Sequence, residues 1–330
     1  MSSSDSQKMP LATLTAMVVG GMVGAGVFSI PRNFAMATGV YGALIAWTIA
    51  GLGMLMLAFV FQTLANRKPD LDAGVYAYAR AGFGPYLGFA SAFGYWASAC
   101  VGNVSYWVLI KSTLGGVFPV FGDGNTVSAV AVSSIGIWAF HFMVLRGTKE
   151  AAAINKIVTI AKVIPLLVFL VLVIFAFNPE VFAANLWGGA GATQDYLHAH
   201  GDLVAAGTAS AARDYGNLFE QVKATMLITV FVFLGIEGAS NYSRFAQKRE
   251  DVGTATVVGF LGVLALFASV SILSFGVMPR AEIQQLSQPS VGGVLAAAVG
   301  AWGATFIGIG VVVSVLGAYL AWTLMSAEVL

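Results

Sequence analysis

Charged residues are scarce in this sequence of 330 residues: only 9% are Asp, Glu, Lys or Arg, whereas 58% are hydrophobic. A soluble domain usually carries about 25% charged residues, because water must wet its surface. So little charge is typical of a protein surrounded by lipid, and the net charge of +1 gives no basis for binding nucleic acid. Cysteine is almost absent, and the single Cys100 excludes an internal disulfide.

Instead of charged residues, the sequence contains long apolar runs. A helix needs about 20 mainly apolar residues to cross the hydrocarbon core of a membrane. Eight segments meet this need, and the predicted spans are 10–31, 39–65, 83–111, 126–145, 152–177, 220–243, 252–277 and 293–326. The first run is too long for the apolar part of a signal peptide, about 7–15 residues, so we expect it to be retained. The sequence predicts an all-α polytopic membrane protein with one transmembrane domain over residues 1–330.

The positions of Lys and Arg predict the orientation in the membrane. One set of junctions between spans holds Lys8, Arg67, Lys68, Arg80, Arg146, Lys149, Lys156, Arg244, Lys248 and Arg249. The alternate set holds only Arg32, Lys111, Arg213, Lys223 and Arg280. Because an excess of basic residues in short loops marks the cytoplasmic side, we expect both termini in the cytoplasm and the protein in the inner membrane.

The longest connection, residues 178–217, is expected on the outer face. It contains Asp195, His198, His200 and Asp202. Two histidines beside two aspartates are compatible with a metal site. A solvated loop explains the same residues without a ligand, so we expect no metal and no cofactor.

Two spans are interrupted by glycine-rich sequence at their middle. The first reads Gly-Gly-Met-Val-Gly-Ala-Gly-Val-Phe over residues 20–28, and the sixth reads Phe-Val-Phe-Leu-Gly-Ile-Glu-Gly-Ala-Ser over 231–240. Glycine weakens a helix by about 1 kcal/mol relative to alanine. Unwound backbone at membrane depth survives only where it is buried or lines a cavity. Broken spans at positions one and six indicate an inverted-repeat transporter; the first alone is equally compatible with a Gly20–Gly24 helix-packing face.

Two charged residues lie inside predicted spans. Glu237 adjoins the second interruption, and a carboxylate at mid-membrane costs at least a few kcal/mol, so such residues usually serve function. We expect Glu237 to be a proton-linked or gating residue rather than a purely structural one. Lys162 lies in the first half of the fifth span. Its ammonium either extends to the cytoplasmic surface or replaces a sodium ion between the first and fifth spans.

Polar and aromatic side chains in two other spans are candidates for ligand contact. Tyr95 and Asn103 lie two helical turns apart on one face of the third span. The other aromatic residues of this span, among them Tyr106 and Trp107, are expected at the membrane interfaces. Trp322 in the last span can cover a cationic group by a cation–π contact, worth about 2 kcal/mol when desolvated.

These motifs resemble the amino acid–polyamine–organocation superfamily, and most closely its basic amino acid antiporters, such as arginine–ornithine or lysine exchangers. The matching stretches are Val23–Phe28 with Ile30-Pro31, Phe233–Ala239, Tyr95 with Gly102-Asn103, and Ala321–Thr323. The resemblance covers nearly the whole chain. It implies a five-plus-five inverted-repeat core with discontinuous first and sixth helices.

The resemblance also implies roles for individual residues. The N–H groups of Gly24, Ala25 and Gly26 would hold the substrate carboxylate. Carbonyls around Phe231, Phe233 and Gly235 would hold its α-ammonium. Glu237 would be linked to protonation, and Lys162 would take the place of sodium. Related arginine exchangers carry Trp where this chain has Phe231, and this difference weakens the assignment of arginine.

Length is a second difference from the family. The relatives have twelve spans, whereas eight are predicted here, so the resemblance implies a core that is incomplete in its second repeat.

We expect a secondary antiporter that exchanges arginine or lysine for ornithine or a related cation. A proton-coupled amino acid importer and a ligand-binding sensor are alternatives. No catalytic constellation lies at membrane depth, so an enzyme is not expected. A homodimer is left open.

Overall fold

The computed structural model describes residues 9–68, 70–71, 74–146, 148–188, 217–241 and 246–329. Its regular elements there are helices, with one isolated bridge between Met9 and Ala246. They are α1 (Leu11–Met22), α2 (Gly26–Ala37), α3 (Val40–Arg67), α4 (Gly74–Phe83), α5 (Pro85–Gly115), η2 (Pro119–Phe121), α6 (Val127–Arg146), α7 (Thr148–Phe175), α8 (Pro179–Ala184), α10 (Leu218–Phe231), α11 (Gly238–Asn241), α12 (Arg249–Ser274), α13 (Arg280–Gln285), α14 (Ser290–Val299) and α15 (Trp302–Val329).

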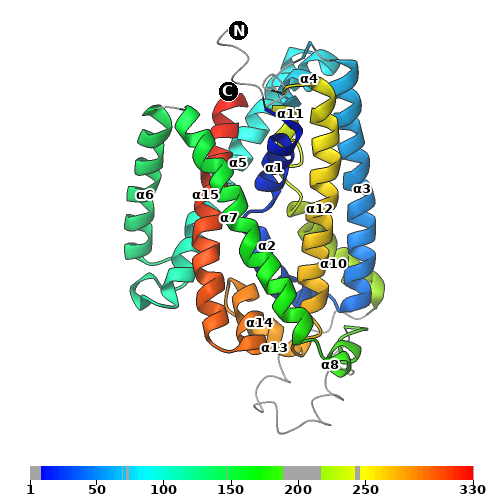
Figure 1. Ribbon diagram of the computed structural model, residues 1–330, viewed down its shortest axis with the longest axis vertical. Helices are drawn as coiled ribbons and strands as arrows, with labels where there is room; N and C mark the ends of the chain where they lie inside the picture. Colours follow the sequence, from blue (N-terminus) through cyan, green and yellow to red (C-terminus); the bar gives the residue numbers. More distant parts are fainter. Residues whose placement is uncertain are drawn as a thin grey trace.

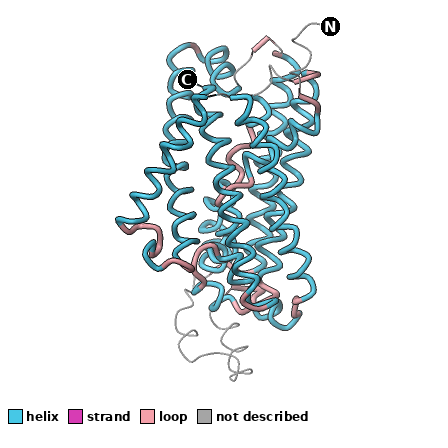
Figure 2. The backbone as a smooth tube through the Cα atoms, turned by 60° about the vertical axis from the view of Figure 1, so that its left-hand side comes forward, coloured by secondary structure: helices cyan, strands magenta, loops and turns pink. Residues whose placement is uncertain are grey.

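The long helices run along the long axis of the molecule, so the bundle has two ends (Figure 1). We name them the α4 end, which also holds α11, and the α13 end, which also holds α8 and α14. The start of α1 and the end of α15 both lie at the α4 end, as an even number of spans requires. Figure 2 shows loop segments inside the bundle as well as at its ends.

Four helices in the described part of the chain are long and apolar enough to cross a membrane by themselves: α3, α6, α12 and α15. The pair α1 and α2 meets the same test as one span bent by 46°. The helices α5 and α7 and the pair α10 and α11 occupy the other three predicted spans. The chain is thus an all-helical multi-pass membrane protein, as predicted.

Two predicted span boundaries are wrong. The last span begins at Trp302 rather than near residue 293, because Gly300 ends α14 with a φ of +94°, a conformation that favours glycine. The first span extends to Ala37 rather than residue 31. Pro31 lies inside α2, where its fixed φ is compatible with a helix and costs the helix one hydrogen bond.

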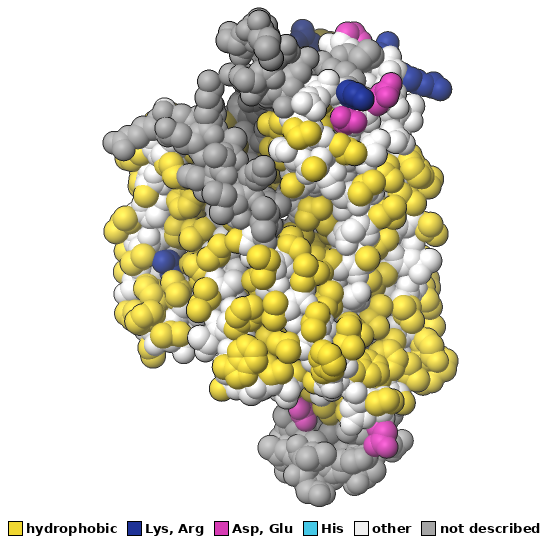
Figure 3. Space-filling view, in the orientation of Figure 1, with side chains coloured by type: hydrophobic (Ala, Val, Ile, Leu, Met, Phe, Trp, Pro, Cys, Tyr) yellow, Lys and Arg dark blue, Asp and Glu magenta, His cyan; other side chains and the backbone are white. Residues whose placement is uncertain are grey.

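An aromatic cluster holds the centre of the bundle together. Phe233, fully buried between α10 and α11, lies 5.0 Å from the ring of Phe260 and 5.7 Å from that of Trp47, centroid to centroid. Trp47 also stacks on Phe34 of α2. Away from this core, apolar side chains cover the middle of the surface, and charged ones gather towards the ends (Figure 3). This distribution matches a lipid-facing belt.

The helix α13 is anchored to the last turn of α2. The buried Arg280 donates from Nε to the Ala35 carbonyl at 2.7 Å, and Gln284 donates to the same oxygen at 2.8 Å. Arg280 also donates to the Gly188 carbonyl. Because the last carbonyls of a helix have no partner within it, these donors stabilise the end of α2 and position the segment after α13 beside it.

Candidate functional site

The first interruption separates α1 from α2 at residues 23–25. Val23 still donates to the Val19 carbonyl at 2.8 Å, and Gly24 turns back to the Met22 carbonyl at 2.9 Å. The helix α2 then starts afresh at Gly26. The first N–H groups of a helix lack intrahelical partners and attract anions, so this break offers donors to a carboxylate inside the membrane.

The second interruption, residues 232–237, is a tightened segment rather than an extended loop. Leu234 donates to the Phe231 carbonyl and Ile236 to the Phe233 carbonyl, both at 3.2 Å. Gly238 donates to the Gly235 carbonyl at 2.9 Å. The three carbonyls predicted to bind an ammonium therefore each accept one N–H already. A carbonyl oxygen has two lone pairs, so each retains one for a ligand.

The two interruptions lie against one another. Gly235 has a φ of +108°, and a Cβ built on it would stand 2.6 Å from the carbonyl carbon of Gly21. A Cβ on Gly26 would stand 3.3 Å from the Val232 side chain. Only small residues permit this approach, which explains Gly21, Gly26 and Gly235.

A cavity of about 720 Å³ adjoins both interruptions. Its wall comes from the α1–α2 break and from α2, α5, α10 and α15. Five of the predicted substrate-binding residues line it: Gly24, Ala25, Gly26, Phe231 and Trp322. No Asp, Glu, Lys, Arg or His belongs to this lining. We call this space the central cavity; its volume suits a small organic ligand.

The other predicted site residues lie around the central cavity rather than on its wall. Phe233 is fully buried in the aromatic cluster, and Gly235 faces Gly21. Tyr95 stacks on Trp322, with 5.7 Å between ring centroids. Asn103 donates to Thr323 at 3.3 Å, and its Oδ1 is buried without a partner in the described part of the chain.

Glu237 is buried behind the cavity, 8% exposed. Its carboxylate accepts a hydrogen bond from the Gly235 N–H at 3.1 Å and interacts with the Tyr95 hydroxyl. Through Gly235 it contacts the second interruption, and through Tyr95 it reaches Trp322 on the cavity wall. A change of charge on this carboxyl group would therefore act on two elements of the site.

Lys162 on α7 is fully buried, and its ammonium donates to the Gly20 carbonyl near the end of α1. The alternative in which this side chain extends to the surface is wrong, because Gly20 provides an acceptor inside the bundle. The ammonium thus stands beside the first interruption, where a bound cation could contact the same carbonyl. Its predicted role in place of sodium stays a prediction.

Sequence reasoning missed the polar residues of α5 on the cavity wall. Ser98, Ser105 and Tyr106 line the central cavity beside Gly102. Their spacing places them on one face of the helix, which was a usable signal. Tyr106, expected at a membrane interface, instead faces the first break, where a Cβ on Gly24 would stand 3.1 Å from its hydroxyl. Trp107 is buried against Phe140 and Tyr319 rather than at an interface.

The candidate metal residues Asp195, His198, His200 and Asp202 lie outside the described residues. In the ranges that are described, no three His, Cys, Asp or Glu side chains come together as metal ligands would.

The fold and the site define a multi-pass helical membrane protein with two interrupted spans facing one cavity whose lining has no charged side chain. Residues 11–330 match the family model described as amino acid permease, and the chain belongs to this family, within the amino acid–polyamine–organocation superfamily.

Curated relatives are similar over the same region. An arginine/ornithine antiporter of Pseudomonas aeruginosa is 51% identical over 330 residues, which are 100% of this chain and 64% of the relative. An L-lysine transport protein of Corynebacterium glutamicum is 45% identical over 99% of this chain and 61% of its own length. A putative arginine/ornithine antiporter of Escherichia coli K12 is 41% identical over 98% of this chain and 66% of its own length. The chain thus spans less than two thirds of these relatives.

Proposed function

We propose that this chain forms the substrate-binding core of a secondary antiporter that exchanges a cationic amino acid, arginine or lysine, for ornithine or a related cation. The observation that carries the proposal is the meeting of the two interrupted spans at the central cavity. The names of the relatives, which are antiporters of arginine and ornithine and a transporter of lysine, support the substrate class.

The substrate would bind by its backbone at the two breaks. Its carboxylate would accept from the N–H groups of Ala25 and Gly26 at the start of α2, and from that of Gly24 once this group releases the Met22 carbonyl. Its α-ammonium would donate to the free lone pairs of the carbonyls of Phe231, Phe233 and Gly235. An amino acid backbone carries these two charges side by side, so it would bridge the interruptions that contact each other at Gly21 and Gly235.

The side chain of the substrate would extend along the cavity wall. The rings of Phe231 and Trp322 line the cavity and would contact its aliphatic part and its cationic end. Tyr95 and Asn103 would position Trp322 and its neighbour Thr323 from behind. The indole Nε1 of Trp322 is buried without a partner in the described residues, so it remains available as a donor.

Glu237 and Lys162 would control movement rather than hold the substrate. Protonation of Glu237 would weaken its bond to Gly235 and alter the second break. Lys162 would keep the end of α1 in place without sodium, through Gly20. We therefore propose a sodium-independent carrier.

In this proposal the fold is a five-plus-five inverted repeat. The spans from α1 to α7 would form the first repeat, and α10 to α15 would belong to the second, so that each repeat starts with a broken helix. The basic side chains Arg67, Lys68, Arg80 and Lys248 flank helices that end or begin at the α4 end. By the positive-inside rule this end, with the N-terminus, would face the cytoplasm of the inner membrane, and the connection 178–217 the other side.

A proton-coupled importer of the same fold is the second candidate. It is favoured by one observation, the buried carboxyl group of Glu237 in contact with both Gly235 and Tyr95. A group that binds the second break directly could couple its protonation to opening of the site.

Uptake of radiolabelled arginine into liposomes that contain the chain tests the proposal. We expect uptake only when ornithine is inside the liposomes, and a changed rate in Glu237→Gln. The matched control is Glu220→Gln, which removes a half-exposed carboxylate outside the site and leaves uptake unchanged. Uptake driven by a pH gradient without internal substrate supports the importer instead. Absence of arginine binding contradicts both candidates.

A further inference from the structure

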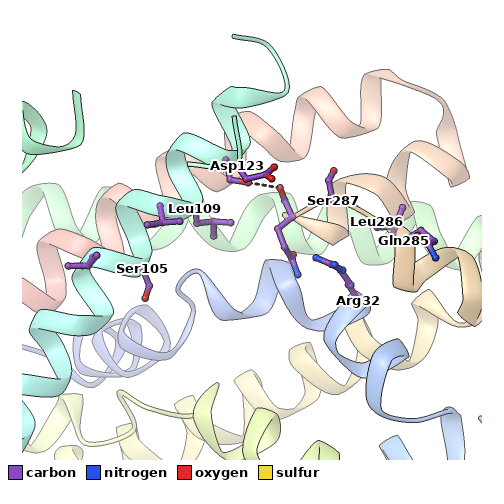
Figure 4. Close-up of a pocket in the computed structure, with 11 residues that line it drawn as sticks. Arg32, Ser105, Leu109, Asp123, Gln285, Leu286 and Ser287 are labelled. Atoms are coloured by element: carbon purple, nitrogen blue, oxygen red, sulfur yellow. Dashed lines mark hydrogen bonds between the residues drawn. The ribbon is translucent and has the colours of Figure 1, made fainter. Parts of the chain in front are cut away.

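A second cavity lies between the central cavity and the α13 end of the bundle. Its volume is about 620 Å³, and α2, α5, the turn after η2 and the segment after α13 line it. Unlike the central cavity, it contains side chains of both charges, Arg32 and Asp123. Figure 4 shows these two on opposite sides of the space. We call it the vestibule.

The vestibule and the central cavity share a wall. Ser105 and Leu109 of α5 line both spaces. Gln288 on the vestibule wall donates to Asn33 on the wall of the central cavity at 3.5 Å. The two spaces are therefore adjacent, separated by these side chains.

Two hydrogen bonds hold Arg32 in place and leave the terminal nitrogens of its guanidinium unused. Its Nε donates to the Gln284 carbonyl at 3.1 Å, and its backbone N–H donates to Ser290 at 3.2 Å. In the part of the chain that the structure describes, its guanidinium forms no ion pair with a carboxylate. Both terminal nitrogens are therefore available for the two oxygens of a carboxylate, the geometry that suits a guanidinium best.

Asp123 is held in place on the opposite side. It follows η2 in a turn closed by a hydrogen bond from Gly124 N–H to the Phe121 carbonyl at 2.9 Å. Thr126 donates to the Val120 carbonyl at 2.8 Å and anchors the same turn. The carboxylate is exposed and, in the described ranges, has no cationic partner. It can accept a hydrogen bond from an ammonium or guanidinium group.

The remaining lining is polar and connects the two sides. Ser112 of α5 donates to the Gln288 carbonyl at 3.3 Å, the dashed bond in Figure 4. Because Arg280 and Gln284 fasten α13 to Ala35 of α2, the segment with Gln285 and Gln288 is fixed relative to Arg32. The charged groups thus stand on anchored backbone before any ligand arrives, which lowers the entropy cost of binding.

We infer that the vestibule is a separate binding site for a cationic amino acid, in which Arg32 holds the α-carboxylate and Asp123 holds the cationic side chain. The inference rests on the proposed transport function. It assigns to that function a site that the substrate occupies before the central cavity and binds with lower affinity. In the vestibule, charged side chains of both signs recognise the ligand. In the central cavity, whose lining has no charged side chain, backbone groups and aromatic rings recognise it.

Equilibrium binding of tritiated arginine to the purified chain tests this inference. We expect two classes of sites, one tight and one weak. Asp123→Asn and Arg32→Lys each weaken the second class about tenfold, the usual loss for one charge-assisted interaction, and leave the tight class in place. The matched control is Glu220→Gln, which removes an outlying carboxylate from the same half of the molecule and leaves both classes unchanged.

Two arginine analogues separate the contacts. Citrulline has the shape of arginine without the side-chain charge, so it should compete about tenfold more weakly than arginine at the weak site of the unaltered chain. Agmatine lacks the carboxylate, so Arg32→Lys should not change its weak binding whereas Asp123→Asn should. Asp123 lies in an exposed turn, where substitution is usually tolerated. The thermal midpoint of unfolding of the Asp123→Asn variant serves as the check on folding.

The outcomes distinguish this inference from the proposed function. A single class of sites, unaffected by Asp123→Asn and Arg32→Lys, overturns the vestibule site while arginine–ornithine exchange in liposomes still supports the proposed function. Equal competition by citrulline at the weak site also overturns it. Absence of both classes overturns the vestibule site together with the proposed function.

Discussion

Gly235 lies against Gly21 so closely that a Cβ on Gly235 would stand 2.6 Å from the Gly21 carbonyl carbon. The two residues belong to different interrupted spans, more than two hundred positions apart in the chain. Their contact joins the end of α1 to the segment between α10 and α11 and positions both breaks at the central cavity.

The variant Gly235→Ala should disrupt this contact. A side chain at a φ of +108° is strained, and here it would also collide with Gly21. We expect arginine affinity to fall by about tenfold or more, because displacement of either break separates the two halves of the backbone site. Equilibrium binding of tritiated arginine measures the effect.

The matched control is Gly262→Ala in α12. No atom lies within 4 Å of a Cβ built there, and alanine favours a helix by up to about 1 kcal/mol. This variant should bind arginine normally and unfold at an equal or higher temperature. Normal binding in Gly235→Ala would contradict the role given to the glycine contact.

The hydrogen bond from Lys162 to Gly20 predicts how arginine binding responds to sodium and to substitution of Lys162. The unaltered chain should bind arginine equally in sodium and in choline buffer. Lys162→Met removes the donor to Gly20 and should weaken binding about tenfold in either buffer, as expected for loss of one charge-assisted hydrogen bond. Lys223→Met, at a site 69% exposed, is the control. Sodium-dependent binding by the unaltered chain would refute this assignment.

The position of Phe231 on the cavity wall predicts that the affinity for arginine depends on the aromatic ring at this residue. Its side chain is 60% exposed and lines the central cavity. Because indole gives the strongest cation–π contact, Phe231→Trp should tighten arginine binding and Phe231→Leu weaken it, each by about two- to fivefold. Phe219→Leu, at an exposed position of the same helix outside the cavity lining, should have no effect. Equal affinities in the three forms would exclude the contact.

Glu282 predicts a pH dependence of stability at the α13 end. Desolvation by burial raises the pKa of this carboxyl group in the folded protein above its ordinary value. The folded state therefore keeps the proton at a higher pH than the unfolded state, and this stabilising contribution is lost as pH rises through the raised pKa. Compared with the unaltered chain, Glu282→Gln should gain in thermal midpoint as pH rises above the ordinary pKa of a glutamate, about 4.3. A difference in thermal midpoint that does not change with pH would argue against this assignment.

Much of the fold could be predicted from local sequence. The apolar runs predict the spans because the thickness of the membrane sets their length, and the glycines at 20–26 and 235–238 predict the interruptions. The boundary at Gly300 escaped prediction because apolar residues flank it on both sides, so composition does not distinguish α14 from the start of α15. Tyr106 was assigned to an interface because composition alone does not show which face of α5 contacts α1 and α2.

By itself, the sequence determined that the chain is helical, that it belongs in lipid, and that its first and sixth spans are broken, since each property depends on residues close together along the chain. Only the tertiary structure decided that Gly235 meets Gly21, that Lys162 reaches Gly20, and that Arg32 and Asp123 line one vestibule. These are contacts between distant elements. They depend on how the helices pack. Other packings of the same helices would have the same local sequence patterns, so these patterns do not distinguish between them.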